Sequence, residues 1–438
     1  MIGACGGVGC TVALGLTAMR RGWADTTGLA SELKPFRQVP LPPIDALVLG
    51  GHEIRRCTYV GAVEEMHRKA RVFDEDLLRR CRSDLRVQQR DVRPGTLTGA
   101  SSPMRKLAER DGVPVDRSPK AAVERLSDDI RYFRKRHALD RVVVVHVAST
   151  EPPAPRRAWH HDDAKLERAL ARRGPSDIPC SSLYALAAIS AECAYVNFTP
   201  STGMDLPVLR ERADRAGLPY MGRDGKTGET LVKSALAPLF AVRNLRILSW
   251  IGENILGNRD GEVLRDPRTR ISKLRSKDRV ISRVVGYAPF TKVGISYVPS
   301  LHDWKVAWDF VHFAGFLDTK MSLQFTWNGS DSLLAAPLVI DLARFAALEL
   351  QAGRSGTMRH LACFFKDPME CEEHNLHEQW QLLVEHTGTH SNVRASPRPA
   401  SPLHKVGSRG VLRRKTTASR ADAAASNSGT QRNPPRIA

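Results

Sequence analysis

The chain has 438 residues, a formal net charge of +19 and 42% hydrophobic residues. This length suits two domains, or one domain with a large insertion, and the hydrophobic content is that of a globular protein. No apolar run approaches the roughly 18 residues of a membrane span, and no basic leader precedes the first apolar stretch, so we expect neither a membrane protein nor a secretory signal.

Cysteine usage and the charge distribution indicate the cellular compartment and the kinds of partner that the protein can have. The eight cysteines form no Cys-x-x-Cys pair, which predicts reduced thiols and a cytoplasmic protein. Residues 391–438 hold ten Lys or Arg against one acid. This segment is rich in Ser, Ala, Pro and Arg and has no aromatic residue, so we expect it to be a disordered basic tail. Because this tail lacks aromatic residues for base stacking, we expect no specific nucleic-acid partner.

A glycine-rich turn opens the chain, with Gly3, Gly6, Gly7 and Val8 before a helix-like run over 11–21. Such a turn presents backbone N–H groups and a positive helix end to a pyrophosphate. Only two residues precede it, whereas a dinucleotide-binding fold needs a first strand of about five residues. We therefore expect the start of the sequence to lie a few residues late, and the short form to bind its dinucleotide weakly or to be unstable.

The next predicted strand covers 44–49 and ends at Gly50-Gly51-His52-Glu53. Glu53, just past the strand, can accept hydrogen bonds from ribose hydroxyls, although an exposed loop glutamate explains the pattern equally well. Helical periodicity with dense charge over 62–137 predicts helices that face solvent.

A continuous apolar run over 141–147 predicts a strand buried in a parallel sheet. Ser149 and Thr150 follow it at the carboxyl edge, where such sheets bind ligands. The residues His160-His161-Asp162-Asp163 could imitate a metal site. A charged helix start explains them better, because the four potential ligands are adjacent in the sequence and no second cluster of ligands accompanies them.

A small apolar helix over 182–194 leads to a strand and polar turn over 195–201. After another helix near 205–216, Lys226-Thr227-Gly228 opens the helix that carries Lys233. The Lys-Thr-Gly-x-Thr turn at a helix start is a suitable anion cradle, but it is not a Walker P-loop because the Gly-x4-Gly-Lys order is missing.

Lysines and aspartates concentrate in the second half of the chain in apolar, glycine-rich surroundings. Several ammonium groups that converge on one pocket suit a phosphorylated, hydroxyl-rich substrate on which negative oxygen develops during the reaction. We prefer this interpretation to a solvated basic surface because three aspartates accompany the lysines. The residues are Lys273, Lys277, Lys305, Asp224, Asp260 and Asp331.

Five segments together resemble the signature blocks of the inositol-3-phosphate synthase (myo-inositol-1-phosphate synthase) family, in the family's order and in its compact prokaryotic form. The resemblance covers roughly residues 1–370. The blocks are 222–234, 256–261, the two Ser-Lys pairs at 272–273 and 276–277, 303–309 and 331–341.

The resemblance implies an α/β fold: a Rossmann-type NAD-binding domain with an inserted, mainly β-sheet α+β domain for catalysis and tetramerisation. It places the first part of the NAD-binding domain at 1–225, the insertion at 226–331, the return segment at 332–390 and the tail at 391–438. Alternating patterns over 292–297 and 321–327 agree with strands in the inserted sheet.

The implied activity is the NAD-dependent isomerisation of D-glucose 6-phosphate to 1D-myo-inositol 3-phosphate by internal oxidation, enolisation, aldol cyclisation and reduction. The implied partners are glucose 6-phosphate and three further copies in a homotetramer, and the cofactors are NAD and, as a second candidate, a monovalent or divalent cation. By position in the blocks, the resemblance assigns catalysis to Lys273, Lys277, Lys305, Lys366, Asp224, Asp260 and Asp331, phosphate binding to Lys226, Thr227 and Gly228, and the cofactor to Gly3, Gly6, Gly7, Val8, Glu53, Ser149, Thr150 and Asp224.

Two other classes remain open from the residues alone. A plain NAD-dependent oxidoreductase on another phosphorylated sugar or polyol would share the glycine turn and the cation cluster, but it would release NADH stoichiometrically. A non-catalytic, RNA-associated protein is suggested only by the basic charge, and the four lysines and three aspartates argue against it.

Overall fold

The structure is a computed structural model that describes residues 1–108, 112–265 and 279–389. The predicted tail lies outside these ranges, as do Lys273 and Lys277. In the described ranges no helix is both long and apolar enough to cross a bilayer.

A parallel sheet organises the first half of the chain. Its strands are β1 Gly51–Glu53, β2 Val92–Pro94, β3 Val143–His146, β4 Ala194–Asn197, β5 Pro219–Gly222 and β10 Gly356–Thr357. Ile2 pairs with both His52 and His146 and so occupies the position between β1 and β3. The spatial order is therefore β2-β1-Ile2-β3-β4-β5-β10, all parallel, which is the strand order of a Rossmann fold.

The strand predicted at 44–49 is wrong. Ile44–Ala46 forms a 3₁₀ helix, and the strand is Gly51–Glu53. The physical reason is where the neighbouring strands offer backbone hydrogen-bonding groups. Ile2 on one side and β2 on the other pair with residues 51–53, and neither of them pairs with the apolar run 44–49. The strands predicted around residues 141–147 and 195–201 are confirmed as β3 and β4.

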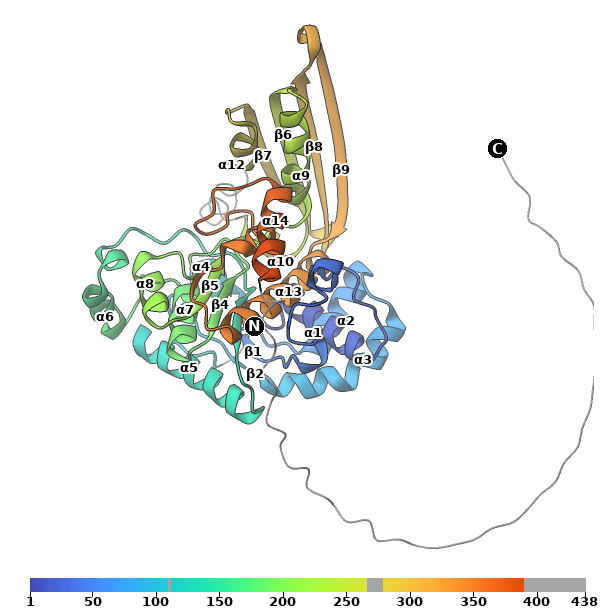
Figure 1. The fold of residues 1–438 in the computed structure, drawn as a ribbon. Helices are drawn as coiled ribbons and strands as arrows, with labels where there is room; N and C mark the ends of the chain where they lie inside the picture. Colours follow the sequence, from blue (N-terminus) through green and yellow to red (C-terminus); the bar gives the residue numbers. More distant parts are fainter. Residues whose placement is uncertain (109–111, 266–278, 390–438) are drawn as a thin grey trace, which may run out of the picture. The chain divides into compact units, whose positions relative to one another are not determined.

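Helices lie around this sheet and alternate with its strands along the chain (Figure 1). They are α1 Gly7–Arg20, α2 Tyr59–Ala70, α3 Glu75–Gln88, α4 Ser102–Leu107, α5 Pro119–Arg136, α6 Asp163–Ala171, α7 Cys180–Ser190, α8 Pro207–Arg215, α13 Asp331–Gln351 and α14 Leu376–Gly388. Asp162 caps α6 by accepting a 2.9 Å hydrogen bond from the backbone N–H of Lys165. The two aspartates of the segment 160–163 therefore form a helix start, as predicted, while its two histidines end the preceding 3₁₀ helix Ala158–His161.

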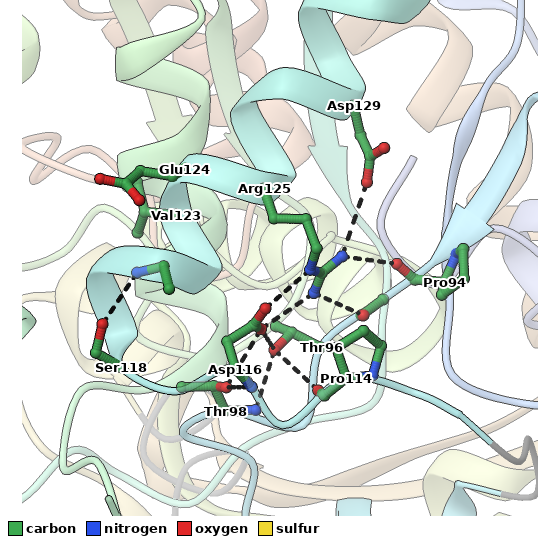
Figure 2. Close-up of polar contacts among 12 residues, drawn as sticks. Pro94, Thr96, Thr98, Pro114, Asp116, Ser118, Val123, Glu124, Arg125 and Asp129 are labelled. Atoms are coloured by element: carbon green, nitrogen blue, oxygen red, sulfur yellow. Dashed lines mark hydrogen bonds and ion pairs between the residues drawn. The ribbon is translucent and has the colours of Figure 1, made fainter. Parts of the chain in front are cut away.

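Arg125 on α5 fixes the segment that follows β2 (Figure 2). Its Nε donates to Oδ1 of Asp116 at 2.9 Å, and its Nη1 donates to the carbonyl of Pro94 at 3.3 Å. The hydroxyl of Thr96 donates to Oδ2 of the same Asp116 at 2.8 Å. A bidentate guanidinium–carboxylate pair holds its geometry well, so this loop at the carboxyl end of β2 has a defined position.

The second sheet has the order β7-β6-β8-β9, with β6 Arg246–Leu256, β7 Phe290–Tyr297, β8 Trp304–Ala314 and β9 Lys320–Ser330. The helices described in this part are α9 Gly228–Val242, α10 Arg259–Val263 and α12 Arg279–Val285. Trp250, Phe240 and Val311 form a core between α9 and the sheet, and Figure 1 shows α9 and α12 beside the strands. The strands predicted at 292–297 and 321–327 are confirmed within β7 and β9.

A buried charge network joins α9 to this sheet. Nζ of Lys233 lies 2.5 Å from a carboxylate oxygen of Glu229 and 3.5 Å from Oδ1 of Asp309. The indole N–H of Trp250 donates to the same Asp309 oxygen at 2.7 Å. All four residues are almost fully buried, so α9, whose first turn follows the predicted anion cradle, is held firmly on β6 and β8.

Candidate active site

A cavity of about 680 Å³ lies at the carboxyl ends of the first sheet's strands and extends to the edge of the second sheet. This edge is where open α/β sheets bind ligands. The cavity brings together most of the residues that the sequence singles out: Gly3, Gly6, Gly7, Val8, Glu53, Ser149, Thr150, Asp224, Thr227, Asp260, Lys305, Asp331 and Lys366.

The glycine turn is shaped by close backbone approach. Gly3 has φ +83°, and a Cβ there would lie 2.8 Å from the Cα of Ala148. A Cβ on Gly7 would lie 2.4 Å from Oγ of Ser332 on α13. Helix α1 begins at Gly7 without a side-chain cap, so its first N–H groups are directed to the cavity and suit a dinucleotide pyrophosphate.

Glu53 stands at the end of β1, beside this turn. Its carboxylate accepts hydrogen bonds from the backbone N–H groups of Cys5 at 2.9 Å, Ile54 at 2.9 Å and Arg55 at 3.1 Å. Glu53 is therefore buried and holds the glycine turn in place. It is not the exposed loop residue of the alternative interpretation.

Lys366 and Asp224 form the first of two Lys–Asp pairs in the cavity. Nζ of Lys366 donates to Oδ1 of Asp224 at 2.8 Å, and both side chains are only 5% exposed. The backbone creates the pair: the N–H of Lys366 donates to the carbonyl of Asp224 at 2.7 Å, and Gly225 forms a bridge with Phe365. The return segment after α13 thus delivers a lysine to the turn after β5.

Lys305 and Asp331 form the second pair. Nζ of Lys305, near the start of β8, lies 3.2 Å from Oδ1 of Asp331, the first residue of α13. The Nδ2 group of Asn258 donates to the other oxygen of Asp331 at 3.4 Å. A carboxylate in the first turn of a helix is favoured by the helix dipole, which stabilises this aspartate in its charged form.

Asp260 links the insertion to the carboxyl edge of β3. Its Oδ1 accepts a hydrogen bond of 3.1 Å from the hydroxyl of Thr150. Asn258 caps α10 by accepting from the N–H of Gly261 at 3.0 Å, so Asp260 sits in the first turn of that helix. The cavity thus combines the glycine turn with the Lys366–Asp224 pair, the Lys305–Asp331 pair and Asp260.

Comparison with known proteins agrees with this geometry. A model of an NAD-binding family, described as myo-inositol-1-phosphate synthase, matches residues 1–387.

The chain belongs to the myo-inositol-1-phosphate synthase family.

Among curated relatives, inositol-3-phosphate synthase 1 of Bacteroides thetaiotaomicron is 32% identical over 410 residues, which cover 87% of this chain and 92% of the relative. The inositol-3-phosphate synthase of Trypanosoma brucei brucei is 32% identical over 72% of this chain, but the match spans only 62% of that longer protein.

Two solved structures share the fold. Inositol-3-phosphate synthase from Caenorhabditis elegans superimposes with a TM-score of 0.78 at 22% identity, over 92% of this chain and 88% of that one. A myo-inositol-1-phosphate synthase-related protein from Thermotoga maritima gives 0.71 at 23% identity, over 89% and 97%. The predicted Rossmann-type fold with an inserted sheet is thereby confirmed.

Several residues that line the cavity were not predicted as site residues, among them Asn258, Asp303 and Ser332. The hydroxyl of Ser332 donates to Oδ1 of Asp303 at 2.6 Å, and burial raises the pKa of this aspartate. The sequence did contain a signal, because Asp303 precedes Lys305 by two residues and their side chains share one face of an extended segment.

Two predicted phosphate-binding residues, Lys226 and Gly228, do not line the cavity. The Nζ group of Lys226 donates to the side-chain oxygen of Gln379 on α14, and burial lowers the pKa of this lysine to about 8. Thr227 does line the cavity. The predicted anion cradle therefore contributes Thr227 to the cavity wall, while the side chain of Lys226 points toward α14.

The described residues contain two groups of three side chains with metal-ligand spacing: Cys5, Glu53 and Cys57, and Glu349, His360 and His386. The rings of His360 and His386 are stacked 3.7 Å apart at 4°, so one ion cannot lie in both ring planes, as imidazole coordination needs. Neither group includes the aspartates of the cavity, and a bound cation stays a prediction.

Proposed function

We propose that this chain is an inositol-3-phosphate synthase, which isomerises D-glucose 6-phosphate to 1D-myo-inositol 3-phosphate with NAD as cofactor. The observation that carries the proposal is the single cavity that joins the glycine turn of α1 to the Lys305–Asp331 and Lys366–Asp224 pairs. Such a site can hold a dinucleotide against a phosphorylated sugar and supply positive charge where oxygen becomes negative.

NAD, when bound, accepts a hydride from the sugar and returns it, so the reaction has no net redox change. The Gly3–Val8 turn holds the pyrophosphate, and Ser149 and Thr150 line the cofactor side of the cavity. Lys305 and Lys366, each held by an aspartate, stabilise sugar oxyanions or move protons at adjacent carbons. Lys273 and Lys277 are proposed to complete this group of cations.

The substrate phosphate is proposed to bind at the start of α9. Thr227 is the N-cap of this helix and makes no side-chain capping bond, and Gly228 has φ +53°. The first N–H groups of α9 are therefore suited to an anion. Lys226 adds a positive charge close to this turn, although its side chain bonds to Gln379 in this structure.

The exposed face of the second sheet supports a homotetramer. Trp304 and Trp308 are 37% and 39% exposed, and the rings of Trp308, Phe310 and His312 stack along β8. Large exposed aromatic rows mark interaction surfaces.

We propose that residues 226–331 form the catalytic and oligomerisation insertion, between 1–225 and the return segment 332–390. We also propose a cytoplasmic location, because all eight cysteines are free thiols.

The test is to incubate the full chain with glucose 6-phosphate and NAD, to identify the product by phosphorus NMR, and to follow NADH by absorbance. We expect myo-inositol 3-phosphate without net NADH. Stoichiometric release of NADH with an oxidised sugar phosphate would instead identify an oxidoreductase on the same scaffold.

A further inference from the structure

We propose that Arg55 is a phosphate-binding residue of the cofactor site, and that this site accepts a 2′-phosphorylated dinucleotide, NADP, as well as NAD. The inference rests on the proposed dinucleotide site and concerns its selectivity. It follows from the way Glu53 and Arg55 use their hydrogen-bonding groups.

An acid at the end of the second strand selects NAD when its oxygens accept the two ribose hydroxyls. In this chain, Oε1 of Glu53 already accepts from the N–H groups of Ile54 and Arg55, and Oε2 accepts from the N–H of Cys5. A carboxylate has about four acceptor positions, so Glu53 retains room for one ribose hydroxyl but not for a bidentate contact. Its main task here is to fix the glycine turn.

Arg55 lies two residues further on and lines the cavity. Its Nη2 donates to the carbonyl of Cys5 at 2.6 Å, and its Nε lies 3.5 Å from Oε1 of Glu53. These contacts use part of the five-donor guanidinium fork, which matches a phosphate group in shape and charge. Glu53 and Arg55 together are neutral, so the repulsion by which a lone acid rejects a 2′-phosphate is largely cancelled.

The rim of the cavity beside Arg55 carries further positive charge. Lys69 and Arg259 both line the cavity, and their side chains lie 2.6 Å and 3.4 Å from a carboxylate oxygen of Glu65. These two cations add to the positive potential around Arg55, which favours a more anionic dinucleotide at this end of the site.

The experiment is calorimetric titration of the full chain with NAD and with NADP, without sugar substrate. For the wild type we expect dissociation constants that agree within roughly tenfold. Arg55→Gln should weaken NADP binding by roughly tenfold or more, because a charge-assisted contact is lost, and NAD binding by less than about threefold. Arg56→Gln, at the exposed neighbouring residue, is the matched control and should change neither constant.

Arg55→Lys is a second variant that perturbs the fold less, because it keeps the positive charge but not the guanidinium fork. Its affinity for NADP should lie between those of the wild type and Arg55→Gln, and its affinity for NAD should not change. Wild-type binding of NADP more than about a hundredfold weaker than NAD would overturn the inference. If the Arg55 variants weakened the binding of NAD and NADP equally, the inference would also be overturned, because the guanidinium would then contact the pyrophosphate or hold the glycine turn. Absence of NAD binding in the wild type would contradict the proposed function itself.

Discussion

Lys366 and Asp224 are 142 residues apart in the sequence, and Nζ of Lys366 donates a hydrogen bond of 2.8 Å to Oδ1 of Asp224. The pair joins the turn after β5 to the segment after α13, at the wall of the cavity. Because both side chains are almost fully buried, the two opposite charges compensate each other in a place that water does not reach.

Removing one member of this pair should therefore destabilise the protein. Lys366→Met removes the ammonium group that donates to the buried Asp224 carboxylate, and we expect a loss of about 3–5 kcal/mol in the free energy of unfolding, measured by urea denaturation. The double variant Lys366→Met with Asp224→Asn should regain much of the stability but no activity. Full stability of the single variant would contradict a compensating pair, and an active double variant would remove both residues from the mechanism.

Lys305 should be needed for turnover but not for folding. Lys305→Ala removes a cation near the developing oxyanion, and we expect the rate of inositol phosphate formation to fall by about 10²–10³-fold. The measurement is product formation with glucose 6-phosphate and NAD. Lys320→Ala is the control, because that lysine is exposed at the far end of β9 and pairs with the exposed Asp318. Near-normal turnover by the Lys305 variant would exclude the proposed role.

Acid should destabilise the protein through His146. Both ring nitrogens of this histidine are buried without a hydrogen-bond partner among the described residues, and burial lowers its pKa from 6.5 to about 3. Between these values the unfolded chain binds a proton that the folded chain does not, so stability falls as pH falls below 6.5. From pH 6.5 to 5 the loss from this group is about 2 kcal/mol.

The variant that isolates this effect is His146→Phe, which keeps an aromatic ring beside Tyr184. Urea unfolding at pH 7.5, 6.5 and 5 should show a smaller loss for the variant than for the wild type, even if the variant is less stable at neutral pH. The same slope in both proteins would mean that His146 is protonated in the folded state.

Truncation after His390 should leave activity and thermal stability nearly unchanged. The removed segment is rich in Ser, Ala, Pro and Arg and has no aromatic residue, so we expect it to bury little apolar surface and to contribute little to folding. Calorimetric melting and the synthase assay on both lengths provide the check. A drop of several degrees in Tm, which corresponds to roughly 1–2 kcal/mol, would show that the segment docks on the rest of the chain.

Local sequence patterns were sufficient for much of the fold. The valine run of β3, the small apolar residues of α7 and the alternation in β7 and β9 each encode one element, because their periodicity reflects which side chains are buried. The glycine turn and the Thr227 cradle could also be located, since helix starts with glycine and without a capping side chain have a recognisable pattern.

Tertiary structure decided what the patterns left open. The apolar run before Gly51 is not a strand, because Ile2 and β2 offer backbone partners only to residues 51–53. The sequence predicted Lys305, Lys366, Asp224 and Asp331 as site residues, but their pairing depends on how the return segment folds back against the turn after β5 and on where α13 begins. The rotation of Lys226 toward Gln379 and the commitment of Glu53 to the glycine turn are likewise long-range contacts, which no local periodicity encodes.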